Sequence, residues 1–244
     1  MNFKISIIIP CYNAEKWIKK CVSSALNQDY DNVEVIAVDN ESEDGTYAIL
    51  KDLKKENKNL IISSAKNIYP NCWDEARLEG FKLATGDYLF TLASDDHLSP
   101  SYITNCMEYI SLAPDKILAF QSPIRSIEGE EEKYLGDHHH FYRSIEEFKK
   151  MATELCPVNS PTVVYSRKLY DEGLIETNPE KYGGAADYDL YCSLASKNIL
   201  IYPSNQWLGY YYRWHEEQAT WNVKKEGINY DKMIQDYWSK EWKT

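Results

Sequence analysis

The chain has 244 residues, enough to bury a sizeable core as one α/β domain or as two fused subdomains. Its 27 Lys and Arg residues against 38 Asp and Glu give a net charge of −11 with no basic stripe, which disfavours a nucleic-acid partner held by phosphate neutralisation, so we expect none. The six cysteines have no paired spacing and follow no secretory leader, so we expect reduced thiols and a cytoplasmic location. No apolar run reaches roughly 18 residues, so we expect no transmembrane segment, and peripheral association with a membrane stays open.

The first hundred residues alternate predicted strands with predicted helices. A β-branched run predicts a strand over residues 4–10 that ends at Pro10, and Asn13 has the residue type of an N-cap for a helix over residues 14–27. Gly86 is expected in the left-handed conformation that ends many helices. Further strands are predicted over 33–38, 60–63 and 88–93, and further helices over 46–57 and 71–85. This alternation predicts a mainly parallel sheet with helices on both faces.

The later part of the chain is richer in aromatic residues. Ser99-Pro100 is typical of a helix start, and the acidic segment 128–140, with Gly129 and Gly136, predicts a mobile loop. The spacing of Ser144 and Glu147 predicts a capping box. Additional strands are predicted over 117–121, 162–165, 199–202 and 209–213, with a helix closed by Gly173 and another from Asp187 to about Lys197.

Two adjacent carboxylates follow the apolar run 88–93. Ligands of open α/β sheets bind outside the carboxyl ends of the strands, so Asp95 and Asp96 are expected to face a site. Adjacent carboxylates repel one another unless a cation lies beside them, and Mg²⁺ or Mn²⁺ on a diphosphate supplies that charge. The alternative is a solvated turn that caps the helix starting near Ser99.

Several motifs occur in one order along most of the chain. They are Pro-x-Tyr-Asn at 10–13, Val-Asp-x-x-Ser-x-Asp-Gly-Thr at 38–46, Ala-Thr-Gly-Asp-Tyr at 84–88, Ser-Asp-Asp at 94–96, Asp-Tyr-Asp-Leu at 187–190 and Tyr-Arg-Trp-His at 212–215. In this order the sequence resembles the family 2 glycosyltransferases of the GT-A fold. The resemblance implies a Rossmann-like α/β domain with a mixed, mainly parallel central sheet flanked by helices. Within that continuous domain, residues 1–100 would form the nucleotide-sugar half, and residues 101–244 the acceptor and catalytic-base half.

The resemblance also implies a role for individual residues. Asp187 matches the catalytic base, and Asp96 and His215 match positions that reach the metal, an Mn²⁺ or Mg²⁺ ion, with Asp96 the direct ligand. Tyr12 matches the position that packs on the donor base, and Asp39 the carboxylate that accepts a hydrogen bond from a pyrimidine ring N–H. The implied donor-nucleotide site comprises Pro10, Tyr12, Asn13, Asp39, Arg77, Ser94 and Asp95.

Simple chemistry supports these roles. A departing diphosphate gains negative charge, so a cation and Arg77 would stabilise the transition state more than the ground state. An acceptor hydroxyl is a poor nucleophile and needs a carboxylate such as Asp187 to take its proton. Each residue also has a plainer interpretation. Asp187 could be only the N-cap of its helix, and His215 a surface histidine.

Other chemistry-bearing residues are less specific. Three consecutive histidines, His138 to His140, cannot all aim at one ion from regular structure, so a solvated or acceptor-side loop is expected. Trp207, Trp214 and Trp221 are candidates for an acceptor wall or for core packing.

The sequence departs from the family pattern at Ala93, Asn40-Glu41, Leu78 and Ala186, which leaves the donor open. The prediction is an inverting glycosyltransferase that moves one sugar from a UDP or dTDP donor to a hydroxyl of a glycan or lipid-linked saccharide. The alternatives are a nucleotidyltransferase on a related fold and a non-catalytic module that binds sugar or nucleotide.

Overall fold

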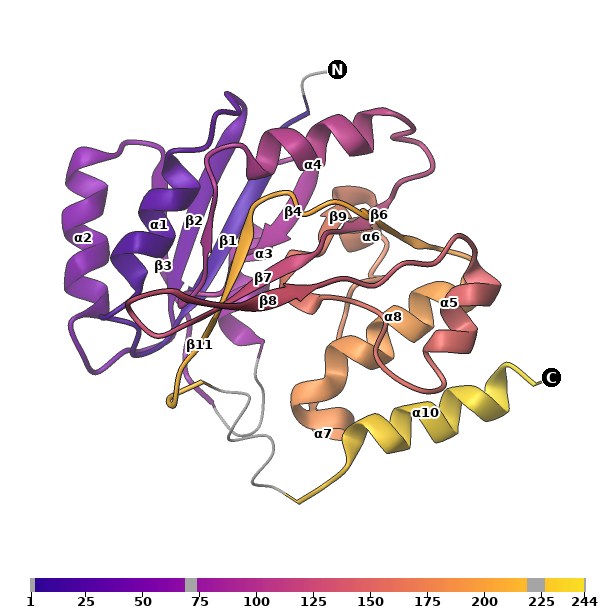
Figure 1. The fold of residues 1–244 in the computed structure, drawn as a ribbon. Helices are drawn as coiled ribbons and strands as arrows, with labels where there is room; N and C mark the ends of the chain where they lie inside the picture. Colours follow the sequence, from indigo (N-terminus) through magenta and orange to yellow (C-terminus); the bar gives the residue numbers. More distant parts are fainter. Residues whose placement is uncertain (1–2, 69–73, 219–226, 244) are drawn as a thin grey trace.

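A seven-stranded sheet forms the centre of the molecule in a computed structural model that describes residues 3–68, 74–218 and 227–243 (Figure 1). All neighbouring strands are parallel except at β9, which is antiparallel to both β4 and β6. In spatial order the strands are β10 (Ile201–Pro203), β6 (Ala119–Gln121), β9 (Val164–Ser166), β4 (Tyr88–Thr91), β1 (Ile5–Cys11), β2 (Val33–Asp39) and β3 (Leu60–Ser64).

Helices cover both faces of this sheet, which explains the apolar run Ile7 to Ile9 within β1. Ile7 and Ile9 belong to one core cluster and Ile8 to the other, because successive strand residues point to opposite faces. The first cluster is closed by α1 (Ile18–Leu26), α2 (Thr46–Glu56) and α4 (Tyr102–Ser111). The second is closed by α3 (Glu75–Leu83), α5 (Ile145–Met151), α6 (Arg167–Asp171), α7 (Pro179–Tyr182), α8 (Ala186–Ser196) and α10 (Tyr230–Glu241). The predicted α/β fold with a mainly parallel sheet flanked by helices is therefore confirmed.

A second sheet of four strands crosses in front of the first in Figure 1. Its strands, in spatial order, are β5 (His97–Leu98), β11 (Tyr210–Trp214), β7 (Ile124–Glu128) and β8 (Lys133–His138). β7 and β8 form an antiparallel hairpin. The prediction of a mobile loop over 128–140 is therefore wrong for most of that segment, which is the turn and second strand of this hairpin.

Two local predictions are also wrong. Asn13 does not cap α1, which begins at Ile18; its φ of 47° instead turns the chain after β1. Gly86 is not in the left-handed region. A Cβ there would lie 2.7 Å from the backbone nitrogen of Ser6 and 2.9 Å from the carbonyl oxygen of Lys4, so glycine is needed for close approach of the chain to β1.

Other predicted elements are confirmed with shifted ends. Gly173, with a φ of 68°, follows α6. The Ser144 hydroxyl accepts a hydrogen bond from the Glu147 N–H at 3.2 Å, which is one half of the predicted capping box, and the Glu147 carboxylate accepts the Arg143 N–H at 2.8 Å. Short 3₁₀ turns occupy Ser160–Thr162 and Gly183–Ala185. Of the helix predicted over 71–85, residues 71–73 lie outside the described residues.

The main sheet takes four strands from the first hundred residues and three from the remainder. The assignment of nucleotide and acceptor functions to the two parts stays a prediction. No helix in the described ranges combines the length and the apolar character needed to cross a bilayer.

Candidate active site

The loops after β1 and β2 are tied together at the carboxyl edge of the main sheet. Asn13 donates its backbone N–H to the Ser42 hydroxyl at 3.0 Å, and its side-chain oxygen accepts the Glu43 N–H at 2.8 Å. The Asn40 N–H donates to the Cys11 carbonyl at 2.8 Å. These bonds hold both loops in fixed register over the strand ends. Asn13, predicted to touch the donor, therefore shapes the loop that presents Tyr12.

Asp39 is the last residue of β2 and is only 5% exposed. Its Oδ2 atom accepts the Ser42 N–H at 3.2 Å. Its Oδ1 atom is buried and has no hydrogen-bond partner among the described residues. A buried carboxylate oxygen without a donor is costly, so a ligand N–H at this position would be stabilised. Tyr12 follows Cys11, the β1 partner of Asp39, and leaves its ring 49% exposed.

The acidic turn joins the two sheets. β4 ends at Thr91, Ser94 and Asp95 form a turn, and the chain enters β5 at His97. The Asp96 N–H donates a hydrogen bond to the Ala93 carbonyl at 3.1 Å, across this turn. Asp95 and Asp96 therefore point to different surroundings.

Asp95 faces His215. The Asp95 Oδ2 atom lies 3.0 Å from His215 Nε2, and both side chains are partly exposed. The indole of Trp17, just before α1, packs against the His215 ring with centroids 5.4 Å apart. The structure thus brings together two predicted site residues from distant parts of the chain.

Asp96 is held inside the protein and is 2% exposed. Its Oδ2 atom accepts the Tyr210 hydroxyl at 2.6 Å, and its Oδ1 atom accepts the Arg213 N–H at 2.7 Å. Burial, with the neighbouring charge of Asp95, raises the pKa of Asp96 well above its ordinary value. Both oxygens are thus engaged by protein donors, so the geometry favours Asp95 over Asp96 as the carboxylate that partners His215.

A divalent cation fits the Asp95 and His215 pair by donor chemistry. A carboxylate oxygen and an imidazole nitrogen suit Mn²⁺, and such ions commonly take few protein ligands beside phosphate oxygens and water. Within the described ranges no three His, Cys, Asp or Glu side chains converge on one point. This donor set would therefore need the diphosphate to complete the coordination of the metal.

Arg77 lies in α3 and is bound to Asp74, the residue before that helix. Its Nε and Nη2 atoms donate to the two Asp74 oxygens at 3.2 and 2.8 Å, and its side chain is 13% exposed. The predicted contact of Arg77 with the donor stays a prediction, and in this structure the guanidinium is paired with Asp74. Its charge nevertheless acts on Asp187, whose pKa it lowers.

Asp187 lies in the first turn of α8 and not at its N-cap, which is Ala185. Its Oδ1 atom accepts the Tyr188 N–H at 2.8 Å, and Ser160 gives a further hydrogen bond. Burial outweighs these bonds and raises the pKa of Asp187. A carboxylate with a raised pKa is a stronger base, which suits proton abstraction.

The remaining candidates occupy varied positions. Pro10 pairs with Val38 inside the sheet register. Trp207 packs on the Arg125 guanidinium at 3.8 Å, and Trp214 packs edge-on against Tyr212. His138 ends β8, whereas Trp221 lies outside the described residues.

Sequence reasoning missed four residues that shape the site. Tyr210 holds Asp96, Trp17 packs on His215, Ser160 contacts Asp187, and Glu132 binds Arg213 behind the acidic turn. Tyr210 lies next to the Tyr-Arg-Trp-His segment, which was a usable signal. No sequence signal marked Glu132, because it belongs to the segment expected to be a loop.

Comparison with known proteins gives consistent matches. The profile of the family described as "Glycosyl transferase family 2" matches residues 6–175. A glycosyltransferase of Rickettsia bellii, itself described as uncharacterized, is 30% identical over 197 residues, which cover 81% of this chain. The match spans 27% of that relative's length.

Two solved structures share the fold. TarS of S. aureus, in complex with UDP-GlcNAc, has a TM-score of 0.68 at 22% identity, over 88% of this chain and 60% of that one. The mannosyltransferase PcManGT of Pyrobaculum calidifontis, in complex with GDP-Man and Mn²⁺, has a TM-score of 0.66 at 15% identity, over 92% of this chain and 61% of that one. The fold is of the GT-A type.

Proposed function

Since the chain belongs to glycosyl transferase family 2 and is therefore a glycosyltransferase, we propose that it moves a single sugar from a UDP or dTDP donor to a hydroxyl of a glycan or lipid-linked saccharide. Residues 1–100 bind the nucleotide sugar in this proposal, and residues 101–244 supply the acceptor side and the base. Family membership favours it over the nucleotidyltransferase and the binding-module alternatives. The two structural neighbours carry different nucleotides, so the choice of base depends on the residues of this chain.

The observation that carries the proposal is the buried Asp39 Oδ1 atom, which has no partner in the described part of the chain. Uracil and thymine present a ring N–H at N3, whereas the same nitrogen of cytosine carries no hydrogen. A carboxylate can only accept hydrogen bonds when ionised, so it suits uracil or thymine. Tyr12, at the next strand end, supplies an exposed aromatic face for the base.

Asp95 and His215 would hold a divalent cation against the donor diphosphate. When bound, that cation would neutralise the negative charge that the diphosphate gains as the sugar departs. Trp17 fixes the imidazole plane of His215, and the closed turn at Asp96 fixes Asp95.

Asp187 acts as the general base in this proposal. It accepts the proton of the acceptor hydroxyl while that oxygen forms a bond to the anomeric carbon. The bond from that carbon to the diphosphate oxygen breaks, and its electron pair leaves with the diphosphate. Attack opposite the leaving group inverts the anomeric configuration. The raised pKa of Asp187 makes it a better proton acceptor than an exposed aspartate.

Calorimetric titration with UDP, dTDP, CDP and GDP, each with and without Mn²⁺, tests the donor assignment. The expected result is that UDP or dTDP binds and that Mn²⁺ strengthens this binding, with weaker binding of CDP and GDP. Absence of metal-dependent binding for all four nucleotides would contradict the proposal. Binding of CDP as tight as that of UDP would contradict the role of Asp39.

A further inference from the structure

Arg213 carries a buried charge directly behind the acidic turn. The residue is 1% exposed, although it is among the largest side chains in the core. Its Nε atom donates to the backbone carbonyl of Asp95 at 2.8 Å, and its own N–H donates to Asp96 Oδ1 at 2.7 Å. The guanidinium lies over the Trp17 ring, 4.6 Å from its centroid. One residue thus binds both aspartates of the turn and contacts the aromatic ring that packs on His215.

A buried guanidinium is costly unless it is paired and its N–H groups are satisfied. The turn of the β7–β8 hairpin provides this. Arg213 Nη2 donates to Glu132 Oε1 at 2.6 Å, and Nη1 donates to the Gly129 carbonyl. Arg213 Nη2 also lies 3.4 Å from His97 Nδ1. The Glu132 carboxylate is therefore the counter-ion of Arg213, supplied by an element outside the main sheet.

The backbone at Glu132 is unfavourable for glutamate. Its φ of 54° lies in the left-handed region, which costs roughly 1 kcal/mol for a residue with a Cβ. Glycine would fit the turn better, so side-chain contacts must offset the backbone cost. These contacts are with Arg213 and with Lys20 of α1, which also pairs with Glu132.

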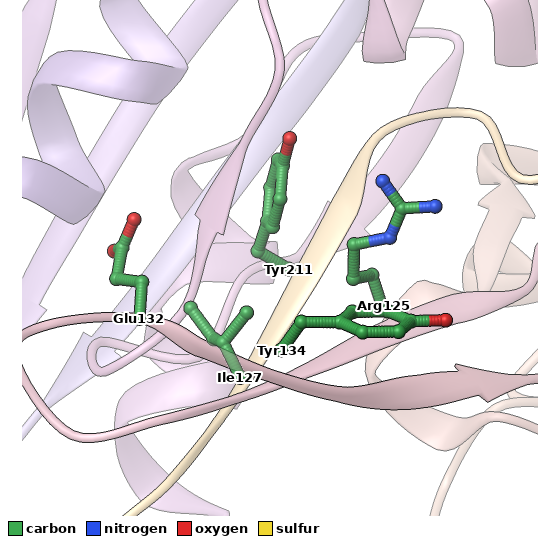
Figure 2. A pocket seen from close by; sticks show the side chains of 5 residues that line it. All are labelled: Arg125, Ile127, Glu132, Tyr134 and Tyr211. Atoms are coloured by element: carbon green, nitrogen blue, oxygen red, sulfur yellow. The ribbon is translucent and has the colours of Figure 1, made fainter.

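The Glu132 side chain is partly exposed to solvent. It is 27% exposed and lines a pocket of about 440 Å³ with Arg125, Ile127, Tyr134 and Tyr211. In the view of Figure 2, the Glu132 carboxylate and the Arg125 guanidinium stand on opposite sides of the Tyr211 ring. An amide at this position could still reach water and accept a hydrogen bond from Arg213, so Glu132→Gln removes the counter-ion of the guanidinium but keeps a hydrogen-bond acceptor for it.

We infer that Glu132 and Arg213 are positioning residues that fix the turn carrying Asp95, so that its carboxylate meets His215. Glu132 holds the guanidinium, and the guanidinium holds the Asp95 carbonyl. Trp17 touches both Arg213 and His215, so displacement of the guanidinium would also disturb the imidazole. This inference rests on the proposed metal site. It assigns to the hairpin turn a part in building that site.

The test compares Glu132→Gln with Asp137→Asn. Asp137 accepts two hydrogen bonds from Arg125 at 2.8 Å each in the same hairpin but touches no residue of the acidic turn in the described structure. Mn²⁺ affinity in the presence of UDP is measured from the electron paramagnetic resonance signal of free Mn²⁺. Metal-free UDP binding and thermal unfolding are measured in parallel.

We expect Glu132→Gln to weaken Mn²⁺ binding about tenfold, which is the scale typical of residues that orient metal ligands. UDP binding without metal should be unchanged. Asp137→Asn should keep wild-type Mn²⁺ affinity. Wild-type Mn²⁺ affinity in Glu132→Gln, or an equal loss in both variants, would overturn the inference while leaving the proposed function intact. Failure of the wild-type protein to bind Mn²⁺ with UDP would overturn both.

Discussion

Asp95 and His215 are 120 residues apart in the chain, yet Asp95 Oδ2 and His215 Nε2 lie 3.0 Å apart at the carboxyl edge of the main sheet. Asp96, the immediate neighbour of Asp95, is instead bound by Tyr210 and by the backbone of Arg213. Adjacent carboxylates therefore have separate tasks. Asp96 supports the junction of the two sheets, and Asp95, partly exposed beside His215, is the proposed metal ligand.

The first prediction concerns Asp95 and His215. Asp95→Asn or His215→Ala should weaken Mn²⁺ binding in the presence of UDP by at least about tenfold, because each removes one of two expected protein ligands. UDP binding without metal should persist, since Tyr12 and Asp39 are untouched. Calorimetry with and without Mn²⁺ measures both quantities.

His139→Ala is the matched control, because His139 is an exposed histidine of the β8 end. Asp96→Asn should retain more Mn²⁺ affinity than Asp95→Asn and lose more thermal stability. The reverse order would show that the metal binds Asp96.

The second prediction concerns the general base. Asp187→Asn should lower kcat by roughly 10² to 10⁴ fold and leave Mn²⁺–UDP binding intact, because it removes only the proton acceptor. Burial raises the pKa of Asp187, and the base works only when deprotonated. Activity should therefore fall as the pH drops, and this loss should occur at a higher pH than for an exposed aspartate.

Steady-state rates across pH, measured as release of the nucleoside diphosphate, report this acidic limb. Product analysis of the anomeric configuration accompanies them. A fully active Asp187→Asn variant would remove Asp187 from the mechanism, and retention of configuration would contradict direct displacement.

The third prediction concerns Arg77, whose charge lowers the pKa of Asp187 while Asp74 raises it. Arg77→Gln removes the first influence and the positive charge beside Asp74. The pKa of Asp187 should rise, and the acidic limb of the rate profile should move to higher pH. Arg125→Gln, which removes a cation from the other sheet, should leave that limb in place. Identical pH profiles for wild type and Arg77→Gln would contradict the electrostatic coupling.

The fold could be predicted from the sequence wherever strands are buried on both faces. The run Ile7 to Ile9 is apolar throughout because alternate residues enter two different cores. The β7–β8 hairpin could not be predicted. In β8, Lys133, Tyr134 and Leu135 are exposed at the edge of a small sheet, so no burial pattern marks that strand. An acidic composition there is compatible with a strand and with a loop alike.

The candidate site residues could be named from the sequence, but their geometry could not be predicted. Nothing in Ser94-Asp95-Asp96 tells which aspartate is buried, because partners more than 110 residues away decide it. The approach of Glu132 to Arg213 depends likewise on the pairing of β7 with both β8 and β11. Contacts of this kind follow from tertiary packing and have no local signal.

The fourth prediction concerns the opposite end of β2. Burial opposes ionisation of Glu34, but hydrogen bonds from Lys4, Ser6 and Thr85 outweigh it and lower the pKa to about 2. A carboxylate with a lowered pKa stabilises the fold above its ordinary pKa of 4.5, and this contribution is lost as the pH falls toward 2. Glu34→Gln should therefore lower the free energy of unfolding by about 2 kcal/mol at pH 7 and by less at pH 3.

Urea denaturation at both pH values measures this difference. Asp52→Asn, which breaks an exposed ion pair with Lys55, serves as the control and should not change stability at either pH. If Glu34→Gln lowers the free energy of unfolding equally at both pH values, the ionic role of Glu34 is contradicted.

The most direct test of the account is nucleotide choice by Asp39→Asn, measured by calorimetry with UDP and CDP in the presence of Mn²⁺. The Ser42 N–H would hold the amide oxygen of the new side chain, which turns its NH₂ group toward the base. We predict that UDP binding weakens by at least about tenfold and that CDP, whose N3 can accept a hydrogen bond, binds better than to wild type. Unchanged preference for UDP would show that Asp39 does not contact the donor base, and the donor site proposed at this edge of the sheet would be wrong.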